Sequence, residues 1–408
     1  MKNYVLFLLI AVAMSCNNDD PEYQTVNVGI PQVVSKSEFR DLIEIQSPKP
    51  ISQSGKIYAY ENYIFVNDKY EGVHVIDNTD PSAPAAVAYI KIPGNEDISV
   101  KNNFLYADSA IDLVVFDISD IVNIELVGQL EDVFESYDFR FPENIYSVDY
   151  SNYNYETDII IGWTIEERSI EIVDDYGFET INTGSNDSGG LNSVGTGGSL
   201  ARFQIVDNYL YTVGTHDMSI FNISNLSEPT FTNTFYSGNN IETMFQADGY
   251  LYLGSTDGMY IYSLDNAEAP SYVSEFVHWT GCDPVVVDGD YAYLTLRGGN
   301  NCGQQESVLE VIDISDKRYP TLMATHLLEN PYGLGFKEDV LFVCDGQAGL
   351  KVFDKSNPLN LQWVETFSNV HATDVIPLSN SLLMIGNNVL YQYQYTSNSI
   401  TLLSTFQL

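Results

Sequence analysis

The chain has 408 residues, and its 56 Asp and Glu against 17 Lys and Arg give a formal net charge of −39. A surface this acidic repels the phosphates of nucleic acids and of anionic lipid headgroups, which excludes nucleic-acid binding. The charge attracts cations, although it also serves simply to keep a protein soluble. Hydrophobic residues make up 44% of the chain, which is ample for a core.

The chain begins with the features of a secretory signal. Lys2 precedes an apolar run from Tyr4 to Met14, which is too short to cross a bilayer. Small residues then stand directly before Cys16. This segment resembles the lipobox of bacterial lipoproteins, which implies that residues 1–15 are a signal peptide and that Cys16 carries the lipid. An ordinary cleaved signal with an incidental cysteine is the alternative.

Acidic residues follow Cys16 in the stretch NNDDPE, residues 17–22. This stretch resembles the surface-export signal of lipoproteins in the Bacteroidetes group, and a plain acidic tether is the alternative. The resemblance implies an outer-membrane lipoprotein on the cell surface, with a periplasm-facing position as the alternative. Acyl chains would hold an otherwise soluble domain at the membrane. We expect residues 16–35 to form a flexible tether and residues 36–408 to form one domain.

Similar apolar segments recur along the rest of the chain about every 41 residues. They are rich in aromatic and β-branched residues, which favour strands. The eight segments end at Val66, Tyr106, Tyr146, Tyr211, Tyr252, Tyr293, Phe342 and Leu383. Two intervals are longer, and they contain insertions at residues 177–199 and 297–305. The chain is therefore a repeat protein.

A unit of about 41 residues fits four short strands with their turns, the size of one β-propeller blade. In the second unit we predict strands at residues 97–100, 104–107, 113–118 and 124–130. One blade cannot bury both of its faces, so the blades must pack side by side, and closing the ring removes exposed end blades.

We therefore predict an all-β fold, a single β-propeller of eight blades with four antiparallel strands each. Seven blades are the alternative, because the third unit, residues 137–175, is the least regular. A strand at residues 39–45 or at residues 402–408 is a candidate to complete the closing blade.

The third strand of most units ends in an acidic residue before a turn. Examples are LVVFD at 113–117, LEVID at 309–313 and LKVFD at 350–354. Apolar side chains at both parities of these strands predict burial on both faces. The segments resemble the LVIVD repeat of bacterial and archaeal cell-surface proteins over residues 55–395, most clearly in units one, two, six and seven. The resemblance implies a propeller at the cell surface, and it transfers no catalytic residue.

Loops on one face of a propeller surround the mouth of its central channel. They join the fourth strand of one blade to the first strand of the next, or the second strand to the third. The two insertions fall in such loops. A binding face would carry insertions of this kind, although insertions also accumulate where they do no harm.

The same face is predicted to collect carboxylates. At the start of the first strands stand Glu96, Asp97, Glu242, Asp283 and Asp374. The loops between second and third strands add Asp68, Asp108, Asp217, Asp257 and Asp345. A ring of carboxylates offers oxygen ligands to Ca²⁺ or another hard cation. The alternatives are chance clustering in an acidic chain and aspartates that cap turns. No other cofactor is indicated.

Cysteines and aromatic residues give two further predictions for this face. Cys282 and Cys302 fall on the same rim of one unit, so an oxidising compartment favours a disulfide between them and leaves Cys344 unpaired. A three-cysteine metal site is the alternative, although CxxC spacing is absent. The candidate rim-binding residues are His216, His278, Trp279 and His371. The histidines are candidates to bind a metal, and the alternative is that they are ordinary surface residues. Trp279 is a candidate to stack on a sugar ring, and the alternative is that it packs in the core.

The sequence contains no Gly-rich phosphate loop, nucleophile elbow or His-Glu-x-x-His motif. We therefore expect a non-enzymatic, lipid-anchored propeller of the cell envelope that presents its loop-decorated rim to a protein or a glycan. The alternative is a metal-dependent hydrolase or lyase with its site at the channel mouth.

Overall fold

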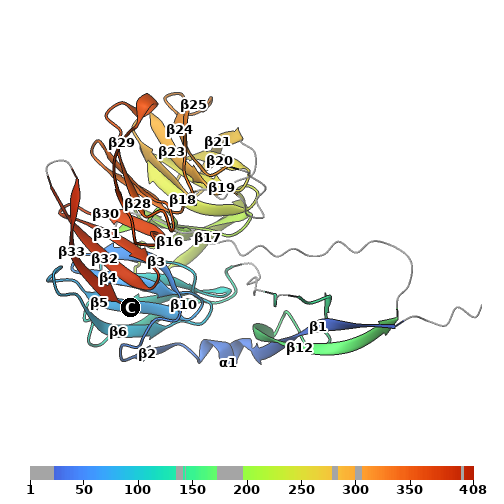
Figure 1. The fold of residues 1–408 in the computed structure, drawn as a ribbon. Coiled ribbons are helices and arrows are strands. Elements are labelled where there is room, and N and C mark those ends of the chain that lie inside the picture. Colours follow the sequence, from blue (N-terminus) through green and yellow to red (C-terminus); the bar gives the residue numbers. More distant parts are fainter. Residues whose placement is uncertain are drawn as a thin grey trace, which may run out of the picture. The chain divides into compact units, whose positions relative to one another are not determined.

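The computed structural model (Figure 1) describes residues 23–134, 141–142, 144–171, 196–277, 284–298, 306–396 and 399–408. The chain divides into two compact units. The ribbon unit comprises Met1–Lys36 and Phe139–Thr183, and the propeller unit comprises Ser37–Asp138 and Gly184–Leu408. In the described part of the chain, no helix is long and apolar enough to span a membrane.

The ribbon unit is built on one long strand pair. β1 (Tyr23–Ser35) pairs antiparallel with β12 (Asp158–Glu171) along its whole length and parallel with the short β11 (Ser147–Val148). Val26 and Val28 of β1 are buried. The prediction of a flexible tether was therefore wrong for Tyr23–Ser35, because a segment about 130 residues further along the chain supplies its partner.

The described residues of the propeller unit form seven four-stranded antiparallel meanders, each of consecutive strands. Blade 1 is β3 (Ser54–Tyr60), β4 (Tyr63–Asp68), β5 (Gly72–Asp77) and β6 (Ala85–Lys91). Blade 2 is β7 (Ile98–Lys101), β8 (Phe104–Ser109), β9 (Asp112–Asp117) and β10 (Glu125–Leu130). Blade 3 is β14 (Phe203–Val206), β15 (Tyr209–Val213), β16 (Asp217–Asn222) and β17 (Thr230–Tyr236). Blade 4 is β18 (Ile241–Ala247), β19 (Tyr250–Ser255), β20 (Gly258–Ser263) and β21 (Ser271–Val277).

The remaining three blades follow the same plan. Blade 5 is β22 (Val285–Asp288), β23 (Tyr291–Leu296), β24 (Val308–Asp313) and β25 (Thr321–Leu327). Blade 6 is β26 (Leu334–Lys337), β27 (Val340–Cys344), β28 (Leu350–Asp354) and β29 (Gln362–Phe367), with the short helix η1 (Pro358–Asn360) before β29. Blade 7 is β30 (Asp374–Pro377), β31 (Ser381–Gly386), β32 (Val389–Tyr395) and β33 (Ile400–Gln407).

The described residues form eight sheets, the number that the eight anchors predict, but the sheets are not equivalent. Seven are the blades. The eighth is the three-stranded sheet β11-β1-β12 of the ribbon unit. The irregular third unit of the sequence supplies β11 and β12 rather than a blade, so the structure has seven four-stranded blades, the alternative of the sequence analysis. The four strands predicted in the second unit are confirmed as β7 to β10.

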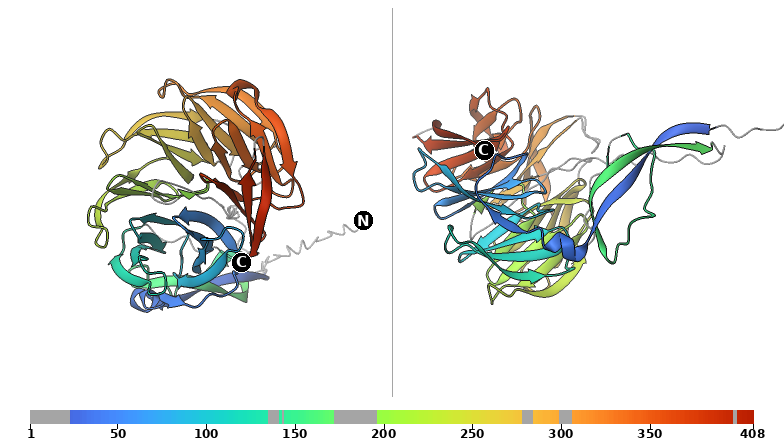
Figure 2. Two further views of the ribbon diagram at one scale, coloured as in Figure 1. Left: turned by 90° about the vertical axis from the view of Figure 1, so that its left-hand side faces the viewer. Right: turned by 90° about the horizontal axis from the view of Figure 1, so that it is seen from below.

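The ring of blades closes without exchanging a strand. β3, the first strand of blade 1, contacts β7 of blade 2 and β30 of blade 7, and β33 lies beside the blade 1 strands in Figure 1. Hydrogen bonds across this junction include Ser404 Oγ to Pro81 O at 2.6 Å and Gln392 Nε2 to Asn78 Oδ1 at 2.6 Å. The left view of Figure 2 shows the blades arranged around a centre.

The two candidate closing strands had different outcomes. Residues 402–408 largely form β33, the outer strand of the last blade, as predicted. Residues 39–45 do not form the predicted strand. They hold the end of α1 (Lys36–Arg40) and the start of β2 (Glu44–Gln46), which pairs with the outer strand β6 of blade 1.

The core lies between neighbouring blades. Tyr106 and Leu113 of blade 2 pack with Phe203 and Leu210 of blade 3, and all four are buried. In β9, Leu113 to Phe116 are fully buried at both parities, because each sheet has a neighbour on both faces. Burial of this kind contributes roughly 1.5–3 kcal/mol for each large apolar side chain.

All seven blades share a register shift at the same place. The register between the third and fourth strands shifts by one residue, so the fourth strand contains one extra residue. The extra residues are Val87, Val127, Thr232, Val273, Met323, Val364 and Leu403. A β-bulge bends and twists a strand, which discourages an outer edge from pairing with another chain.

Candidate functional site

The acidic residue at the end of the third strand stabilises the turn that follows it. It does not form part of a binding site. Asp117, the last residue of β9, accepts a hydrogen bond from the backbone N–H of Ser119 at 2.8 Å. Asp77, Asp313 and Asp354 accept the corresponding hydrogen bond, and Asn222 does the same in blade 3. Hydrogen bonding lowers the pKa of each of these four aspartates. The repeated acid is therefore a structural signature.

Aspartates at the loops between second and third strands hold neighbouring loops in place. Asp108 accepts hydrogen bonds from the backbone N–H groups of Glu96 and Asp97 at 3.0 and 2.9 Å. Asp68 accepts the equivalent hydrogen bonds from the backbone N–H groups of Ser52 and Gln53. Asp345 accepts them from those of Glu329 and Asn330. The two predicted kinds of loop therefore lie side by side on one face. Three of the five loop aspartates have this clamping role.

Three carboxylates of the predicted metal ring lie close to basic side chains of the same chain. Asp97, which is 4% exposed, accepts hydrogen bonds at Oδ2 from the backbone N–H groups of Arg202 and Phe203 at 2.6 and 3.1 Å. Lys56 Nζ lies 3.3 Å from the same oxygen, as an ion pair without hydrogen-bond geometry. Glu96 forms an ion pair with the guanidinium of Arg202. Lys56 and Arg202 thus neutralise these carboxylates.

Asp374, at the start of β30, is the third of these carboxylates. It is 1% exposed, and burial raises its pKa to about 7. Its Oδ1 accepts a hydrogen bond from the N–H of Val375 at 2.9 Å. Burial of Lys56 lowers the pKa of that ammonium. The inner strands therefore bring together a cation and two acids in a shielded environment.

A complete metal ring is not present among the described residues, where no group of three or more His, Cys, Asp or Glu side chains is placed to hold a metal ion. Glu242 is buried in β18 of blade 4. Asp283 lies outside the described residues. The sequence could place the acids on one rim, but it could not show that Lys56 and Arg202 reach the same point.

Residues 196–202, here called the channel segment, cross between inner strands of several blades. β13 (Thr196–Gly197) pairs with β3 of blade 1 on the side away from β4. Ser199 Oγ accepts a hydrogen bond from the N–H of Leu334 in blade 6 at 2.7 Å. Arg202 contacts Asp97 beside blade 2. Residues 177–199 were predicted to be a rim insertion, whereas the described part of them, residues 196–199, passes between the inner strands.

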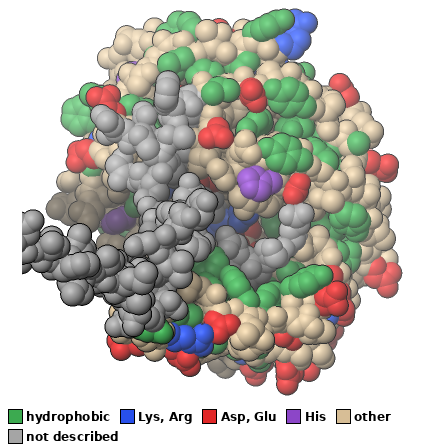
Figure 3. Space-filling view, turned by 90° about the vertical axis from the view of Figure 1, so that its right-hand side faces the viewer, with side chains coloured by type: hydrophobic (Ala, Val, Ile, Leu, Met, Phe, Trp, Pro, Cys, Tyr) green, Lys and Arg blue, Asp and Glu red, His purple; other side chains and the backbone are tan. Residues whose placement is uncertain are grey.

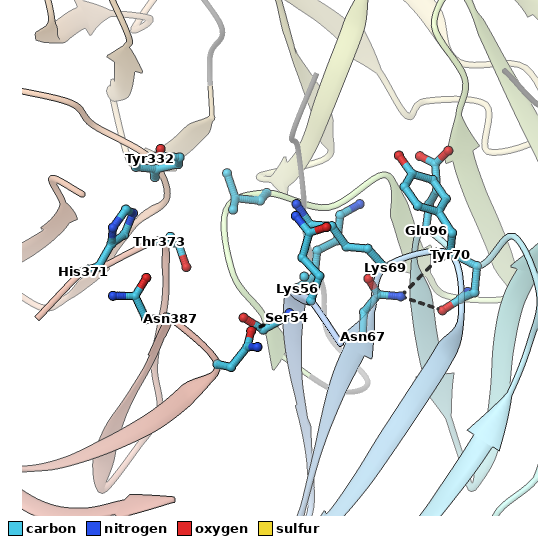
Figure 4. A pocket seen from close by; sticks show the side chains of 15 residues that line it. Ser54, Lys56, Asn67, Lys69, Tyr70, Glu96, Tyr332, His371, Thr373 and Asn387 are labelled. Carbon is cyan, nitrogen blue, oxygen red and sulfur yellow. Dashed lines mark hydrogen bonds between the residues drawn. The ribbon is translucent and has the colours of Figure 1, made fainter. Parts of the chain in front are cut away.

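A pocket of about 260 Å³ opens beside the channel segment. It is lined by Gln53, Ser54, Gly55, Lys56, Asn67, Lys69, Tyr70, Asn95, Glu96, Leu200, Tyr332, His371, Thr373, Asn387 and Asn388. Figure 4 shows Tyr332, His371 and Asn387 on one side and Lys56, Lys69 and Glu96 on the other. Figure 3 shows basic side chains within the hollow at the middle of one face. The pocket is thus shared by blades 1, 2, 6 and 7.

Tyr332 on the aromatic side of the pocket contacts both His371 and Arg297. The Tyr332 ring lies 5.8 Å from the His371 ring, centroid to centroid. The guanidinium carbon of Arg297 lies 4.0 Å from the centre of the Tyr332 ring, a cation–π contact that fixes the ring. His371, one of the predicted rim residues, therefore lines the pocket.

His216, another predicted rim residue, does not line this pocket. His216 lies in blade 3, where its ring stacks on Tyr236 with centroids 6.2 Å apart. His278, Trp279 and the predicted disulfide partners Cys282 and Cys302 lie outside the described residues, as does the lipidation site Cys16. Cys344 is unpaired and buried, as predicted.

A comparison with protein families finds the LVIVD repeat at residues 53–90, 95–132, 197–236 and 282–327. These matches fall on blades 1, 2, 3 and 5. They confirm the predicted resemblance in units one, two and six. They also include the fourth unit, which lies within the predicted span of residues 55–395, and they do not include the seventh. A comparison with curated proteins finds no match.

Solved structures with similar folds have low sequence identity. Sqt1 of Saccharomyces cerevisiae is 9% identical with a TM-score of 0.52, over 90% of this chain and 88% of that chain. The periplasmic gluconolactonase PpgL of Pseudomonas aeruginosa is 10% identical with a TM-score of 0.52, over 87% and 96%. A Lactobacillus plantarum protein is 12% identical with a TM-score of 0.52, over 86% and 96%. At such identities the likeness concerns the fold alone. The chain is therefore a β-propeller protein that contains LVIVD repeats.

Proposed function

We propose that this protein is a non-enzymatic binding scaffold of the cell envelope, and that its ligand docks in the pocket beside the channel segment. The observation that carries the proposal is the state of the buried carboxylates around that pocket. Asp97 is saturated by backbone N–H groups and Glu96 is paired with Arg202. These acids hold the blades together and are not open for catalysis or for a metal.

The lining of the pocket favours recognition of a polar ligand. Side-chain amides and hydroxyls make up much of it, and Tyr332 and His371 add flat apolar surface. A concave site with a few converging polar groups is the usual form of a small-ligand site. The ligand would be a glycan or a polar segment of a protein partner.

Attachment to the outer membrane through Cys16 is part of the same proposal. The support is the apolar run before Cys16 and the acidic stretch after it. Labelling with a radioactive fatty acid tests the anchor, and the Cys16→Ala variant should lose the label. Protease treatment of intact cells tests the location. If only disrupted cells lose the protein, it faces the periplasm.

The pocket is tested by a matched pair of variants. Asn387 and Asn369 both adopt a positive φ, 52° and 69°, so glycine preserves the backbone at either position. Only Asn387 lines the pocket. The full-length protein is applied to immobilised envelope glycans and envelope proteins. Binding that Asn387→Gly weakens and Asn369→Gly preserves supports the proposal. Binding that both variants preserve refutes it.

A further inference from the structure

The lysines and the glutamate that line the pocket already have partners within the protein. Lys56 Nζ lies 3.3 Å from Asp97 Oδ2, and Glu96 forms an ion pair with Arg202. Lys69, the remaining lysine of the lining, also takes part in an interaction of its own. A charged ligand would have to compete with these contacts and to lose its own hydration. A neutral ligand would leave them intact.

Three other side chains of the lining are uncommitted. Within the described part of the chain, the amides of Gln53 and Asn387 and the hydroxyl of Ser54 make no hydrogen bond. Amides and hydroxyls both donate and accept hydrogen bonds, as the hydroxyls of a sugar do. Asn67 and Asn95, by contrast, are bonded to each other, with Asn67 Nδ2 donating to Asn95 Oδ1 at 2.8 Å. The uncommitted groups that a ligand meets in this lining are therefore neutral.

The hairpin between β31 and β32 holds one side of the pocket in place. Asn387 and Asn388 form its tip, and both adopt a positive φ, 52° and 59°, as a tight two-residue turn requires. The side chain of Asn388 reaches blade 1, where its Oδ1 accepts a hydrogen bond from the backbone N–H of Ser54 at 2.9 Å. Gly386 lies so close to the backbone carbonyl of His371 that a Cβ there would overlap it. A site fixed in this way binds a ligand at a lower entropic cost.

The aromatic wall suits the face of a sugar ring. The rings of Tyr332 and His371 lie 5.8 Å apart between centroids, and Figure 4 shows both on the same side of the pocket as Asn387. One face of a pyranose presents C–H groups, which pack well on aromatic surface. An open-chain polyol carries the same hydroxyls but has no such face. The pocket volume of about 260 Å³ lies just below the usual range of small-molecule sites, so it suits one sugar ring.

From these observations we infer that the pocket binds a neutral saccharide, either a free hexose or the hexose at the end of a glycan chain. The hydroxyls of the sugar bond to Gln53, Ser54 and Asn387, and the C–H face of its ring packs on Tyr332 and His371. This inference rests on the proposed binding function and names its ligand class.

Isothermal titration calorimetry with the full-length protein tests the ligand class. The probes are glucose, galactose and mannose, with their disaccharides. The matched alditols sorbitol, galactitol and mannitol are the open-chain controls, and glucuronic acid is the charged control. We expect a neutral sugar to bind with an affinity that NaCl does not change, and its alditol to bind about tenfold more weakly. Tighter binding of the disaccharide than of the hexose identifies a chain end as the natural form, and the reverse identifies the free sugar.

Two matched pairs of variants place the sugar in the pocket. Asn387→Gly should lower the affinity about fivefold, because a neutral hydrogen bond is lost. Asn369→Gly should not, since Asn369 also has a positive φ but does not line the pocket. His371→Ala should weaken binding, whereas His216→Ala, which removes a histidine that contacts Tyr236 away from the pocket, should not. Thermal unfolding of each variant shows that it is folded.

The outcomes separate this inference from the proposed function. Glucuronic acid that binds more tightly than the hexoses overturns the neutral ligand, and equal binding of hexoses and alditols overturns the sugar ring. Sugar binding that neither Asn387→Gly nor His371→Ala weakens overturns the assignment to this pocket. If no sugar binds, the saccharide is overturned. The proposed binding function then stands if Asn387→Gly weakens the retention of an envelope protein, and it falls as well if no binding depends on Asn387.

Discussion

The backbone of Gly198 lies against the side chain of Asp374, so close that a Cβ on Gly198 would overlap the carboxylate. Gly198 belongs to the channel segment and Asp374 to the first strand of blade 7. This contact brings a segment that precedes blade 3 against the inner strand of the last blade. It also shields Asp374 from water, which contributes to the burial that raises its pKa.

Replacing Gly198 should loosen the centre of the ring. Gly198→Ala is expected to destabilise the fold by about 1–3 kcal/mol, because the added methyl group forces the channel segment away from Asp374. Gly214→Ala is the control, since the nearest atom to a Cβ there is 3.8 Å away and its φ is not positive. Denaturation by urea measures both. Equal stability of the two variants would show that the channel segment does not pack as described.

Asp374 should make stability depend on pH near neutrality. Its pKa is raised from 3.8 to about 7 in the folded protein, so the folded state holds a proton that the unfolded state releases. The resulting stabilisation is complete below about pH 4 and disappears as the pH rises through about 7. The stability difference between the wild type and Asp374→Asn should therefore fall as the pH rises from 5 to 8.

The Asp117→Asn variant is the control for this titration. The pKa of Asp117 is lowered in the folded protein by its hydrogen bonds to Ser119, so its contribution is lost only as the pH falls below about 4. The difference between the wild type and Asp117→Asn should stay constant from pH 5 to 8. Urea denaturation at each pH checks both. A constant difference for Asp374→Asn as well would mean that Asp374 does not titrate there.

The aspartate at the end of the third strand should be replaceable by any residue whose side chain accepts the same hydrogen bond in the turn. Asp117→Asn should leave stability nearly unchanged, because Asn222 already makes the equivalent hydrogen bond in blade 3. Asp117→Ala should cost about 1 kcal/mol, since the turn N–H loses its acceptor. Thermal unfolding ranks the two variants. A large loss for Asp117→Asn would indicate that the negative charge has a role of its own.

The bulges should protect the outer strands from association. Deleting Val127 removes the extra residue of β10 and shifts the residues on one side of it to the opposite face of the strand. We expect a less stable protein that aggregates on heating. Val127→Lys keeps the bulge and replaces a side chain that is 37% exposed, so it should behave like the wild type. Light scattering during a thermal ramp distinguishes the variants.

The repeat and its strands were predictable from the sequence because they depend on local chemistry. Short apolar runs rich in β-branched and aromatic residues identify strands such as β9, and Asp117 before Ser119 identifies a turn, whatever surrounds them. The regular order of four strands in each unit places two kinds of loop on one face. These are the loops between second and third strands and the loops that lead from one unit to the next. The same repeated strands carry the resemblance to the LVIVD repeat. The unpaired state of Cys344 also agreed with prediction.

The number of blades and the chemistry of the site were decided by contacts between distant residues. β1 pairs with β12 across more than 120 residues, which removes the third unit from the ring. Lys56 and Arg202 reach Asp97 and Glu96 only because blades 1 and 2 and the channel segment meet at the centre. A sequence shows which residues can be charged or extended, but closure of the ring determines which charges meet, since Coulomb interactions depend on distance and burial.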